Sequence, residues 1–209
     1  MDLWIPVAVV LTSYLIGSLS FAVIVSRLMG LSDPRSYGSK NPGATNVLRS
    51  GSKKAAILTL LLDAAKGWLP VALVLTYGPE HGLGAGVAAL AGLAAFLGHL
   101  YPVFFGFMGG KGVATAVGVV VGVNGPLALA TVLTFAIVVY FSRYVSLASM
   151  VAAVFAPAFY LFGTGVAWQA TAAEVLSLAI MAMLLIWRHR ENINRLLAGT
   201  ESKLGQKKP

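Results

Sequence analysis

Seven apolar runs make up most of the chain, and short stretches rich in glycine, proline and charged residues separate them. Runs of this length predict membrane-spanning helices, since a helix needs about 20 apolar residues to cross a bilayer. We expect helices over residues 3–27, 55–77, 83–101, 112–123, 125–141, 145–162 and 170–187. The fourth run reaches only about 18 Å across a core of about 30 Å. It therefore predicts a short half-helix with a recessed N-terminal end.

Composition is typical of an integral membrane protein. Of the 209 residues, 58% are hydrophobic and 11% are charged, against about 45–50% and about 25% in soluble domains. The first run lacks the basic flank and small-residue cleavage site of a signal peptide, so we expect it to remain as a span. The chain has no cysteine, which excludes disulfides and thiolate chemistry.

Basic residues divide the connections between the runs into two groups. Lysine or arginine occurs in the first, third and fifth connections and in the C-terminal tail, but not in the other three connections. Seven spans place the two groups on opposite sides, and the positive-inside rule makes the basic side cytoplasmic. The sequence thus predicts an all-α integral membrane protein with seven transmembrane helices, a periplasmic N-terminus and a cytoplasmic C-terminus. We expect one membrane domain over residues 1–200 and a basic cytoplasmic tail over 201–209.

A glycine-rich segment precedes the short fourth run, with Gly109, Gly110, Lys111 and Gly112 at its end. Glycines let backbone N–H groups converge, Lys111 adds a positive charge, and the helix that follows adds the positive end of its dipole. Polar, irregular backbone at membrane depth is tolerated only where it is buried in protein or lines a wet cavity. We therefore expect this segment to bind a phosphorylated ligand at the membrane surface.

The first connection carries a second group of polar residues. Glycine and proline indicate a shaped loop, while the side chains of the other residues supply hydrogen-bond donors and a guanidinium group suited to phosphate. These residues are Ser39, Asn41, Thr45, Asn46 and Arg49. A solvated basic loop explains the same composition about equally well, because turns use these residue types in any case.

Two pairs of polar residues near the cytoplasmic side have the three-residue spacing of a shared helix face. Ser146 and Ser149 suit close helix packing and substrate contact equally well. His189 and Asn192 follow the last apolar run on a segment that we expect to continue as a helix. Interfacial anchoring explains the leucines and arginines of that segment but not this pair.

Other polar residues have simpler interpretations. Asp63 and Lys66 lie inside the second run, three residues apart, where they can neutralise each other, and we favour a structural role for them. His99 is more simply a helix-end histidine bonded to backbone than a catalytic base. Glu191 is placed to pair with Arg195 four residues later.

Several kinds of chemistry have no support in the sequence. The three histidines are far apart and lack acids at ligand spacing, so we expect no metal and no cofactor. The glycine segment is not a Walker A motif, since Phe105 and Gly112 stand where glycine and Ser or Thr are required. No histidine is followed five positions later by aspartate, and there is no G-x-S-x-G motif. The net charge of +8 occurs without a nucleic-acid motif, so we expect no nucleic-acid partner.

Three long motifs in one order resemble the bacterial acyl-phosphate:glycerol-3-phosphate acyltransferases, the PlsY family. They are Gly38 to Asn46, Gly98 to Phe104 with Gly109 to Thr115, and Arg188 to Arg190 with Asn192, Ile193, Arg195 and Leu196. The resemblance implies a seven-helix fold in the bacterial inner membrane with its active site facing the cytoplasm. The family usually has glycine where this chain has Lys40, which adds a positive charge beside the expected site.

The resemblance also implies roles for individual residues. Substrate contacts are implied for Ser39, Arg49, Lys111, Ser149, His189 and Asn192. The glycine segment would hold a long-chain acyl phosphate, and the product would be 1-acyl-glycerol 3-phosphate. The leaving phosphate can itself accept the proton of the attacking hydroxyl, so the protein supplies positioning and charge stabilisation. The partners expected are glycerol 3-phosphate, acyl phosphate and membrane lipid, with the protein acting as a monomer.

Two other function classes are weaker. A transporter of a phosphorylated metabolite predicts internal repeats and polar residues that continue to the outer face. No repeat is visible, and the outer connections hold only Glu80 and His81 as ionisable residues. A CDP-alcohol phosphotransferase needs a cluster of aspartates that this chain lacks.

Overall fold

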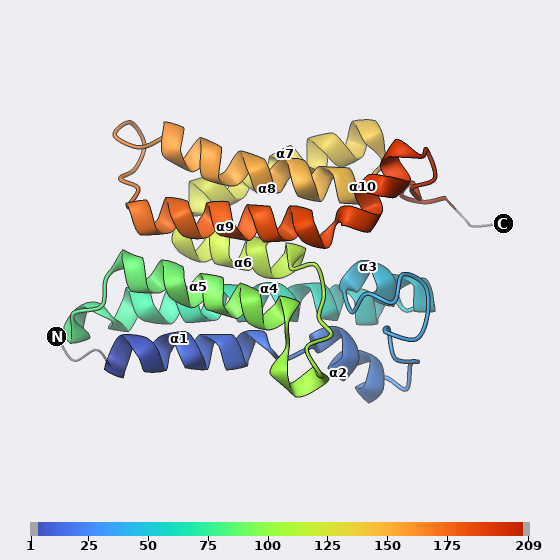
Figure 1. Cartoon of the computed structure of the whole chain (residues 1–209), viewed down its shortest axis with the longest axis horizontal. Coiled ribbons are helices and arrows are strands. Elements are labelled where there is room, and N and C mark those ends of the chain that lie inside the picture. The colour runs from blue at the N-terminus through green and yellow to red at the C-terminus, as the bar shows by residue number, and fades with distance from the viewer. Residues whose placement is uncertain (1–3, 207–209) are drawn as a thin grey trace. The chain divides into compact units, whose positions relative to one another are not determined.

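The computed structural model describes residues 4–206, and ten α-helices dominate this part of the chain. The chain divides into two compact units, Met1–Val123 and Asn124–Pro209. Leu3, Lys207 and Lys208, which belong to the first expected helix and the expected basic tail, lie outside the described residues. The first unit contains α1 (Trp4–Gly17), α2 (Phe21–Leu28), α3 (Ala44–Val47), α4 (Lys53–Tyr77), α5 (Ala85–Leu100) and α6 (Val113–Val123) (Figure 1). The second contains α7 (Gly125–Ser142), α8 (Val145–Phe162), α9 (Ala172–Arg188) and α10 (Arg190–Leu197).

The helices that the apolar runs predict are present. From the second run onward, the observed helix ends lie within two residues of the expected ones. Strands were not expected, and within residues 4–206 the only β-contact is an isolated bridge between Thr164 and Trp168. The all-α class is therefore confirmed.

The first apolar run differs from the expectation of one continuous helix. It forms α1 and α2, which meet at an angle of 43° across Ser18, Leu19 and Ser20. The side chain of Ser18 donates to the carbonyl oxygen of Tyr14 at 2.8 Å. Serine offers such alternatives to the helical ladder, and serine and glycine are frequent at kinks. The apolar pattern does not reveal the break because apolar residues continue on both sides of it.

Length and hydropathy identify the helices that can cross a membrane. Within the described residues, four are long and apolar enough: α4, Ala85–Phe105, α7 and α8. The bent pairs α1 with α2 and α9 with α10 raise the number to six if each is one span. α6 has 11 residues, which is about 16 Å of helix and too short to cross alone. The short half-helix predicted from the sequence is thus present as a helix.

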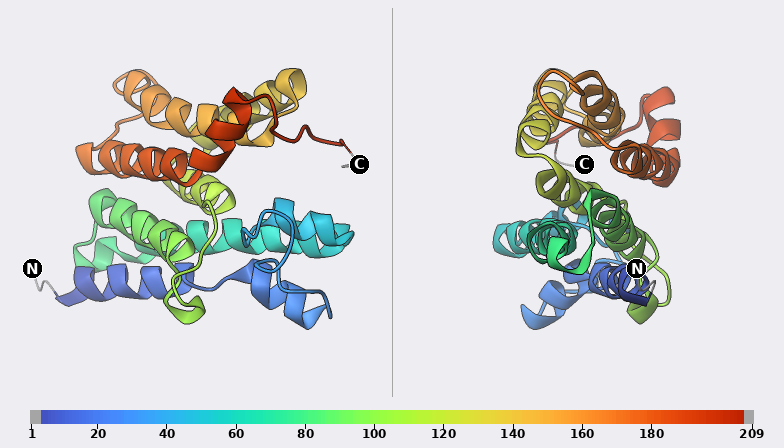
Figure 2. Two further views of the ribbon diagram at one scale, coloured as in Figure 1. Left: turned by 45° about the vertical axis from the view of Figure 1, so that its right-hand side comes forward. Right: turned by 90° about the vertical axis from the view of Figure 1, so that its left-hand side faces the viewer.

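Glycines bring the helices of the first unit into close contact. A Cβ atom on Gly17 of α1 would overlap the carbonyl oxygen of Ala95, and one on Gly98 of α5 would overlap that of Tyr14. Gly67 of α4 and Gly118 of α6 are packed against backbone of the opposite helix in the same way. Small residues allow this approach between membrane helices, where van der Waals packing replaces the hydrophobic effect. Figure 2 shows α1 beside α5 within this unit.

The second unit is held by contacts of α8 with α7 and of α8 with α9. Two of its helices, α7 and α9, begin at side-chain caps. The side chain of Asn124 accepts the N–H of Leu127 at the start of α7, and Thr171 and Glu174 form a capping box at the start of α9. These caps satisfy the first N–H groups of each helix and fix where it begins.

Candidate active site

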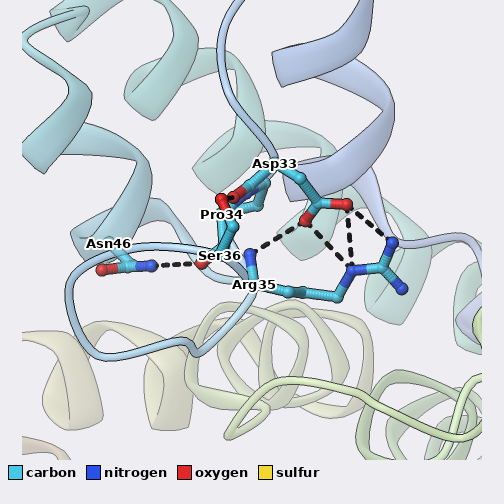
Figure 3. Close-up of polar contacts among 5 residues, drawn as sticks. All are labelled: Asp33, Pro34, Arg35, Ser36 and Asn46. Carbon is cyan, nitrogen blue, oxygen red and sulfur yellow. Dashed lines mark hydrogen bonds and ion pairs between the residues drawn. The ribbon is translucent and has the colours of Figure 1, made fainter.

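The connection between α2 and α3 is folded around the buried side chain of Asn46. Its Oδ1 accepts hydrogen bonds from the N–H of Ser39 at 3.0 Å and from Nη1 of Arg49 at 3.3 Å. Its Nδ2 donates to the carbonyl oxygens of Pro34 at 2.6 Å and Tyr37 at 3.2 Å, and Figure 3 shows the contact with Pro34. Asn46 therefore gives the loop its shape, and direct contact with a substrate remains a prediction for it.

Asp33 and Arg35 form an ion pair within the same loop (Figure 3). Nε and Nη2 of Arg35 donate to the carboxylate of Asp33 at 2.7–3.2 Å, and the N–H of Arg35 donates to it at 2.9 Å. The side-chain hydrogen bond from Arg35 lowers the pKa of Asp33, against a smaller opposing effect of burial. The charge of Arg35 is thus balanced inside the loop.

Other expected ligands lie at the surface of this loop. Ser39, Thr45 and Arg49 are exposed, and Asn41 is half-buried. Gly38 has a φ of +59°, and a Cβ atom there would overlap Oδ1 of Asn46. Glycine at this position therefore lets the side chains of Asn46 and Arg49 close against the backbone beside Ser39. The structure thus brings together Ser39, Asn46 and Arg49, three of the residues that the sequence predicted for the site.

Lys40 has a φ of 55°, in the left-handed region that glycine adopts freely. For a residue with a side chain this conformation costs roughly 1–2 kcal/mol. The turn thus has a backbone conformation that suits the glycine of the resembling family, and the side chain of Lys40 is exposed.

The glycine segment lies directly against the C-terminal end of α5. A Cβ atom on Gly109 would overlap the carbonyl oxygen of His99, and one on Gly110 would overlap Nε2 of its ring. The N–H of Gly110 donates to the carbonyl oxygen of His99 at 3.2 Å. Gly112, with a φ of +83°, packs against side chains of α5. The sequence argument assigned these glycines to anion binding, and the structure shows a second reason for them, namely close packing.

Lys111 is half-buried and stands two residues before α6 begins. The helix start expected from the sequence is confirmed, so the positive end of the α6 dipole lies next to the lysine. Both features favour an anion at this place. Binding of a ligand by Lys111 remains a proposal.

A buried ionic cluster lies next to the glycine segment in the first unit. Nζ of Lys66 is 2.8 Å from Oδ1 of Asp63, which confirms the neutralised pair that the spacing predicts. The same Oδ1 is 3.6 Å from Nδ1 of His99, and Nζ of Lys66 donates to the carbonyl oxygen of Leu19 at 2.6 Å. The pair is thus part of a larger network that the sequence did not reveal.

His189 stands in the second unit where α9 ends and α10 begins, at an angle of 57°. Its Nδ1 is 2.8 Å from the carbonyl oxygen of Leu185. Because a carbonyl oxygen can only accept, Nδ1 carries the proton and Nε2 is the acceptor nitrogen of the neutral ring. His189 and Asn192 are both buried. The helix expected after residue 187 is present, but it changes direction at this histidine.

Glu201 is the centre of the polar contacts around α10. Ser146 Oγ and Asn192 Nδ2 each donate to its Oε1 at 2.6 Å, and Nε of Arg195 donates to Oε2 at 2.7 Å. The expected pair of Arg195 with Glu191 is wrong, since within residues 4–206 Arg195 pairs with Glu201 instead. The carboxylate of Glu201 reaches Arg195 because the chain turns back after α10.

Sequence reasoning missed Glu201 by assigning it to the tail. The signal that points to it is Gly199, which follows α10 with a φ of +69°. Glycine in this conformation ends a helix and reverses the chain. The N–H groups of Thr200 and Glu201 donate back to the carbonyl oxygen of Arg195 at 2.8 and 3.2 Å. A glycine two residues before a lone acid in a basic segment is therefore a usable signal.

Ser146 and Ser149, the expected pair on α8, have different partners. Ser146 contacts Glu201, whereas the buried Ser149 donates to the carbonyl oxygen of Val145 at 2.8 Å. Such back-bonding satisfies a serine hydroxyl inside a helix. The packing alternative therefore has a structural basis for Ser149, and its contact with substrate remains a prediction.

We expect Glu201→Gln to lower the free energy of unfolding by about 1–3 kcal/mol near pH 7, because the amide cannot accept from all three donors. Burial raises the pKa of Glu201, but hydrogen bonds from Ser146, Asn192 and Arg195 outweigh it, and the net pKa is lowered. A lowered pKa in the folded state gives stability that is present above the ordinary pKa and is lost as the pH falls through the folded value.

Thermal unfolding of the purified protein measures this effect. The difference between the wild-type protein and Glu201→Gln should be constant near neutral pH and shrink as the pH falls below about 4.3, the ordinary pKa of glutamate. Glu191→Gln, which changes an exposed glutamate of α10 that makes no contact with Glu201, is the control and should have a much smaller effect. A difference that persists unchanged into acid would show that the carboxylate is not the stabilising group.

The fold and the polar clusters define an integral membrane protein with basic, loop-borne groups suited to anionic ligands. Among residues 4–206, no three His, Cys, Asp or Glu residues are grouped so as to hold a metal ion. A family model described as glycerol-3-phosphate acyltransferase matches residues 7–199. The chain belongs to this family, as its three motifs indicated.

Individual relatives that are similar to this chain carry the name of the same family. The glycerol-3-phosphate acyltransferase of Albidiferax ferrireducens is 65% identical over 207 residues, covering 99% of this chain and 92% of the relative. That of Bordetella petrii is 61% identical, with 99% and 97% covered. Two crystal structures of PlsY (YgiH), an integral membrane glycerol 3-phosphate acyltransferase, are also similar. The glycerol 3-phosphate form is 42% identical with a TM-score of 0.86 over 96% of each chain. The lysophosphatidic acid form is 41% identical with a TM-score of 0.85, covering 96% of this chain and 95% of that one.

Proposed function

We propose that this glycerol-3-phosphate acyltransferase of phospholipid synthesis uses a long-chain acyl phosphate as its donor. The products are 1-acyl-glycerol 3-phosphate and inorganic phosphate. The observation that carries the donor assignment is the compact site at Lys111, where a cation, a tightly packed glycine segment and the start of α6 coincide. These features suit a small dianion at the membrane surface.

The reaction needs little from the protein in the way of acid or base catalysis. The oxygen of the 1-hydroxyl attacks the acyl carbon, and the bond between that carbon and the phosphate oxygen breaks. The leaving phosphate takes the electron pair of the broken bond and accepts the proton of the hydroxyl. Catalysis then comes from positioning and from stabilising negative charge as it moves onto the phosphate. This accounts for an acyltransferase without a nucleophile triad.

The donor and acceptor are assigned to different residues. Lys111 and the segment from Gly109 to Gly112 bind the phosphate of the donor. The N–H of Gly110 already donates to His99, so within this segment the positive charge of Lys111 is the principal contribution that we assign to donor binding. The sequence favoured binding by several converging backbone N–H groups, and this proposal gives the larger part to the charge of Lys111.

The acceptor role falls on side chains that recognise phosphate and hydroxyl groups. Arg49 and Ser39 lie beside each other on the ordered loop around Asn46 and suit the phosphate of glycerol 3-phosphate. Nε2 of His189 is an acceptor in the neutral ring, which suits a substrate hydroxyl. The remaining residues assigned to substrate binding are Asn41, Thr45, Asn192 and Ser149.

The orientation in the membrane is part of the proposal. We place seven spans in the bacterial inner membrane, counting α6 as a half-helix, with the N-terminus periplasmic and the basic connections and C-terminus cytoplasmic. The active site faces the cytoplasm, and the acyl chain leaves sideways into the bilayer, where each buried CH₂ contributes about 0.8 kcal/mol. The protein acts as a monomeric membrane domain over residues 1–200, followed by the basic tail over residues 201–209.

Single cysteines at the two ends of α4 are expected to be labelled from opposite sides of the membrane. The natural chain has no cysteine, and α4 has 25 residues, about 37 Å of helix. Lys54→Cys should react with an impermeant thiol reagent only from the cytoplasmic side, and Glu80→Cys only from the periplasmic side. Both positions are exposed, and neither replaces the cap at Ser52 or the left-handed Gly82. Labelling of both from one side would contradict the orientation.

Turnover by the purified protein in a lipid phase tests the proposed function. With glycerol 3-phosphate and a long-chain acyl phosphate, and without metal or nucleotide, we expect equal amounts of 1-acyl-glycerol 3-phosphate and inorganic phosphate. Phosphate release without acyl transfer to glycerol 3-phosphate would refute the reaction.

A further inference from the structure

Three titratable side chains inside the first unit have no part in the reaction as described. Asp63, Lys66 and His99 are 2%, 3% and 7% exposed. Taking ions out of water is costly, and well-packed apolar residues often stabilise a fold as well or better. A buried ionic cluster is therefore weak evidence for stability alone, and its neighbours indicate what else it does.

One end of the cluster holds the break between α1 and α2. Nζ of Lys66 donates to the carbonyl oxygen of Leu19 at 2.6 Å and lies 5.5 Å from the ring centroid of Phe21. A helix break leaves carbonyl groups without helical partners, and inside a membrane these must be satisfied by protein. Lys66 satisfies the carbonyl of Leu19, so the break has a fixed partner on α4.

The other end of the cluster reaches the glycine segment. Oδ1 of Asp63 is 2.8 Å from Nζ of Lys66 and 3.6 Å from Nδ1 of His99. The carbonyl oxygen of His99 accepts the N–H of Gly110, and Nε2 of its ring is so close that a Cβ atom on Gly110 would overlap it. Both the backbone and the ring of His99 therefore fix the residue next to Lys111.

We propose that Lys66, Asp63 and His99 are positioning residues for acyl transfer, forming a buried chain of contacts that holds Gly110 and so orients Lys111. Asp63 sets the orientation of the His99 ring, and the ring with its carbonyl sets the path of the glycine segment. The proposal rests on the proposed role of Lys111 in binding the donor. A misplacement of about 1 Å at a reacting group can lower the rate about 100-fold, so a small shift of the segment is enough to be measured.

The first test removes both charges of the cluster together. Asp63→Asn combined with Lys66→Met avoids leaving one unpaired ion in the membrane, which would itself destabilise the fold. We expect a folded protein, by size-exclusion elution and thermal unfolding, whose kcat/KM for acyl transfer is about 10- to 100-fold lower. Thr131→Val, at a buried hydroxyl of α7 bonded to its own helix, is the control and should retain wild-type turnover.

The second test changes the link to the glycine segment and leaves the ion pair intact. His99→Phe keeps a ring of similar size but lacks both ring nitrogens, and we expect a similar loss of kcat/KM. Each set of changes is then combined with Lys111→Arg, which by itself should be slow but measurable. If the cluster acts through Lys111, the combined losses will be clearly smaller than the product of the separate ones.

Each outcome bears on the proposal. Folded variants with wild-type turnover would overturn it, and so would losses that multiply independently of Lys111→Arg, because the cluster would then act elsewhere. Failure of both sets of variants to fold would overturn it too, since the cluster would then be needed for folding itself. A failure of the proposed donor site is recognised separately, by near-normal turnover of Lys111→Ala in the otherwise wild-type protein.

Discussion

Lys111→Ala is expected to lower acyl transfer by about 100- to 1,000-fold or more while the protein stays folded, the range seen when one charge-stabilising donor is removed from an active site. The half-buried lysine stands just before α6, where its charge stabilises the phosphate as it leaves. The backbone around it is held by contacts of the neighbouring glycines with α5. The measurement is turnover of acyl phosphate in a lipid phase, together with thermal unfolding.

Two further variants test whether the loss is specific to a lysine at position 111. Lys53→Ala removes an exposed lysine from the first turn of α4 and should have normal turnover. Lys111→Arg should restore activity only poorly, because a planar guanidinium replaces a compact point charge. Near-normal turnover of Lys111→Ala would refute the donor site.

Acyl-CoA and acyl carrier protein are expected to be inert as donors, with turnover at least about 100-fold below that of acyl phosphate. A thioester brings a bulky nucleotide or protein arm, and its thiol leaving group cannot accept the hydroxyl proton as a phosphate does. Lys111 interacts more strongly with a dianionic phosphate than with a neutral thioester, so its charge favours departure of phosphate. The measurement compares the three donors at equal concentration with the same purified protein.

The same turnover assay tests whether the reaction requires a metal ion. A chelator should leave turnover with acyl phosphate unchanged, since no metal takes part in the proposed proton transfer. The Lys111→Ala protein serves as the background for each donor. Comparable rates with acyl-CoA, or a strict need for a divalent metal, would contradict the phosphate-assisted mechanism even though the chain belongs to the acyltransferase family.

The helices were predictable because apolar runs and charged connections are properties of the sequence itself. The break at Leu19 was not, since its partner Lys66 lies 47 residues later. Local sequence cannot show which distant side chain satisfies an interrupted helix. For the same reason the pair of Asp63 and Lys66 was recognised from its spacing, whereas its contact with His99 was not.

The candidate site residues were also predictable only in part. Residue types and spacing selected Ser39, Asn46 and Arg49 as a group, and the structure brings them together. Their separate tasks follow from geometry, because an asparagine that orders a loop and one that binds a ligand look alike in a sequence. Glu201 was missed because its role depends on a chain reversal at Gly199, whereas composition marks the segment only as basic.

The backbone contacts of Gly17 and Gly98 determine where this protein can vary. Neither position can gain a side chain unless α1 and α5 move apart, because the overlapping atoms belong to backbone that cannot rotate away. Leu11 and Leu15 are exposed leucines of α1, the helix that holds Gly17. They have no such limit and can be exchanged for other apolar residues. Mutational tolerance in α1 is therefore lowest where the residue is smallest, the reverse of a soluble core, where large side chains are the least replaceable.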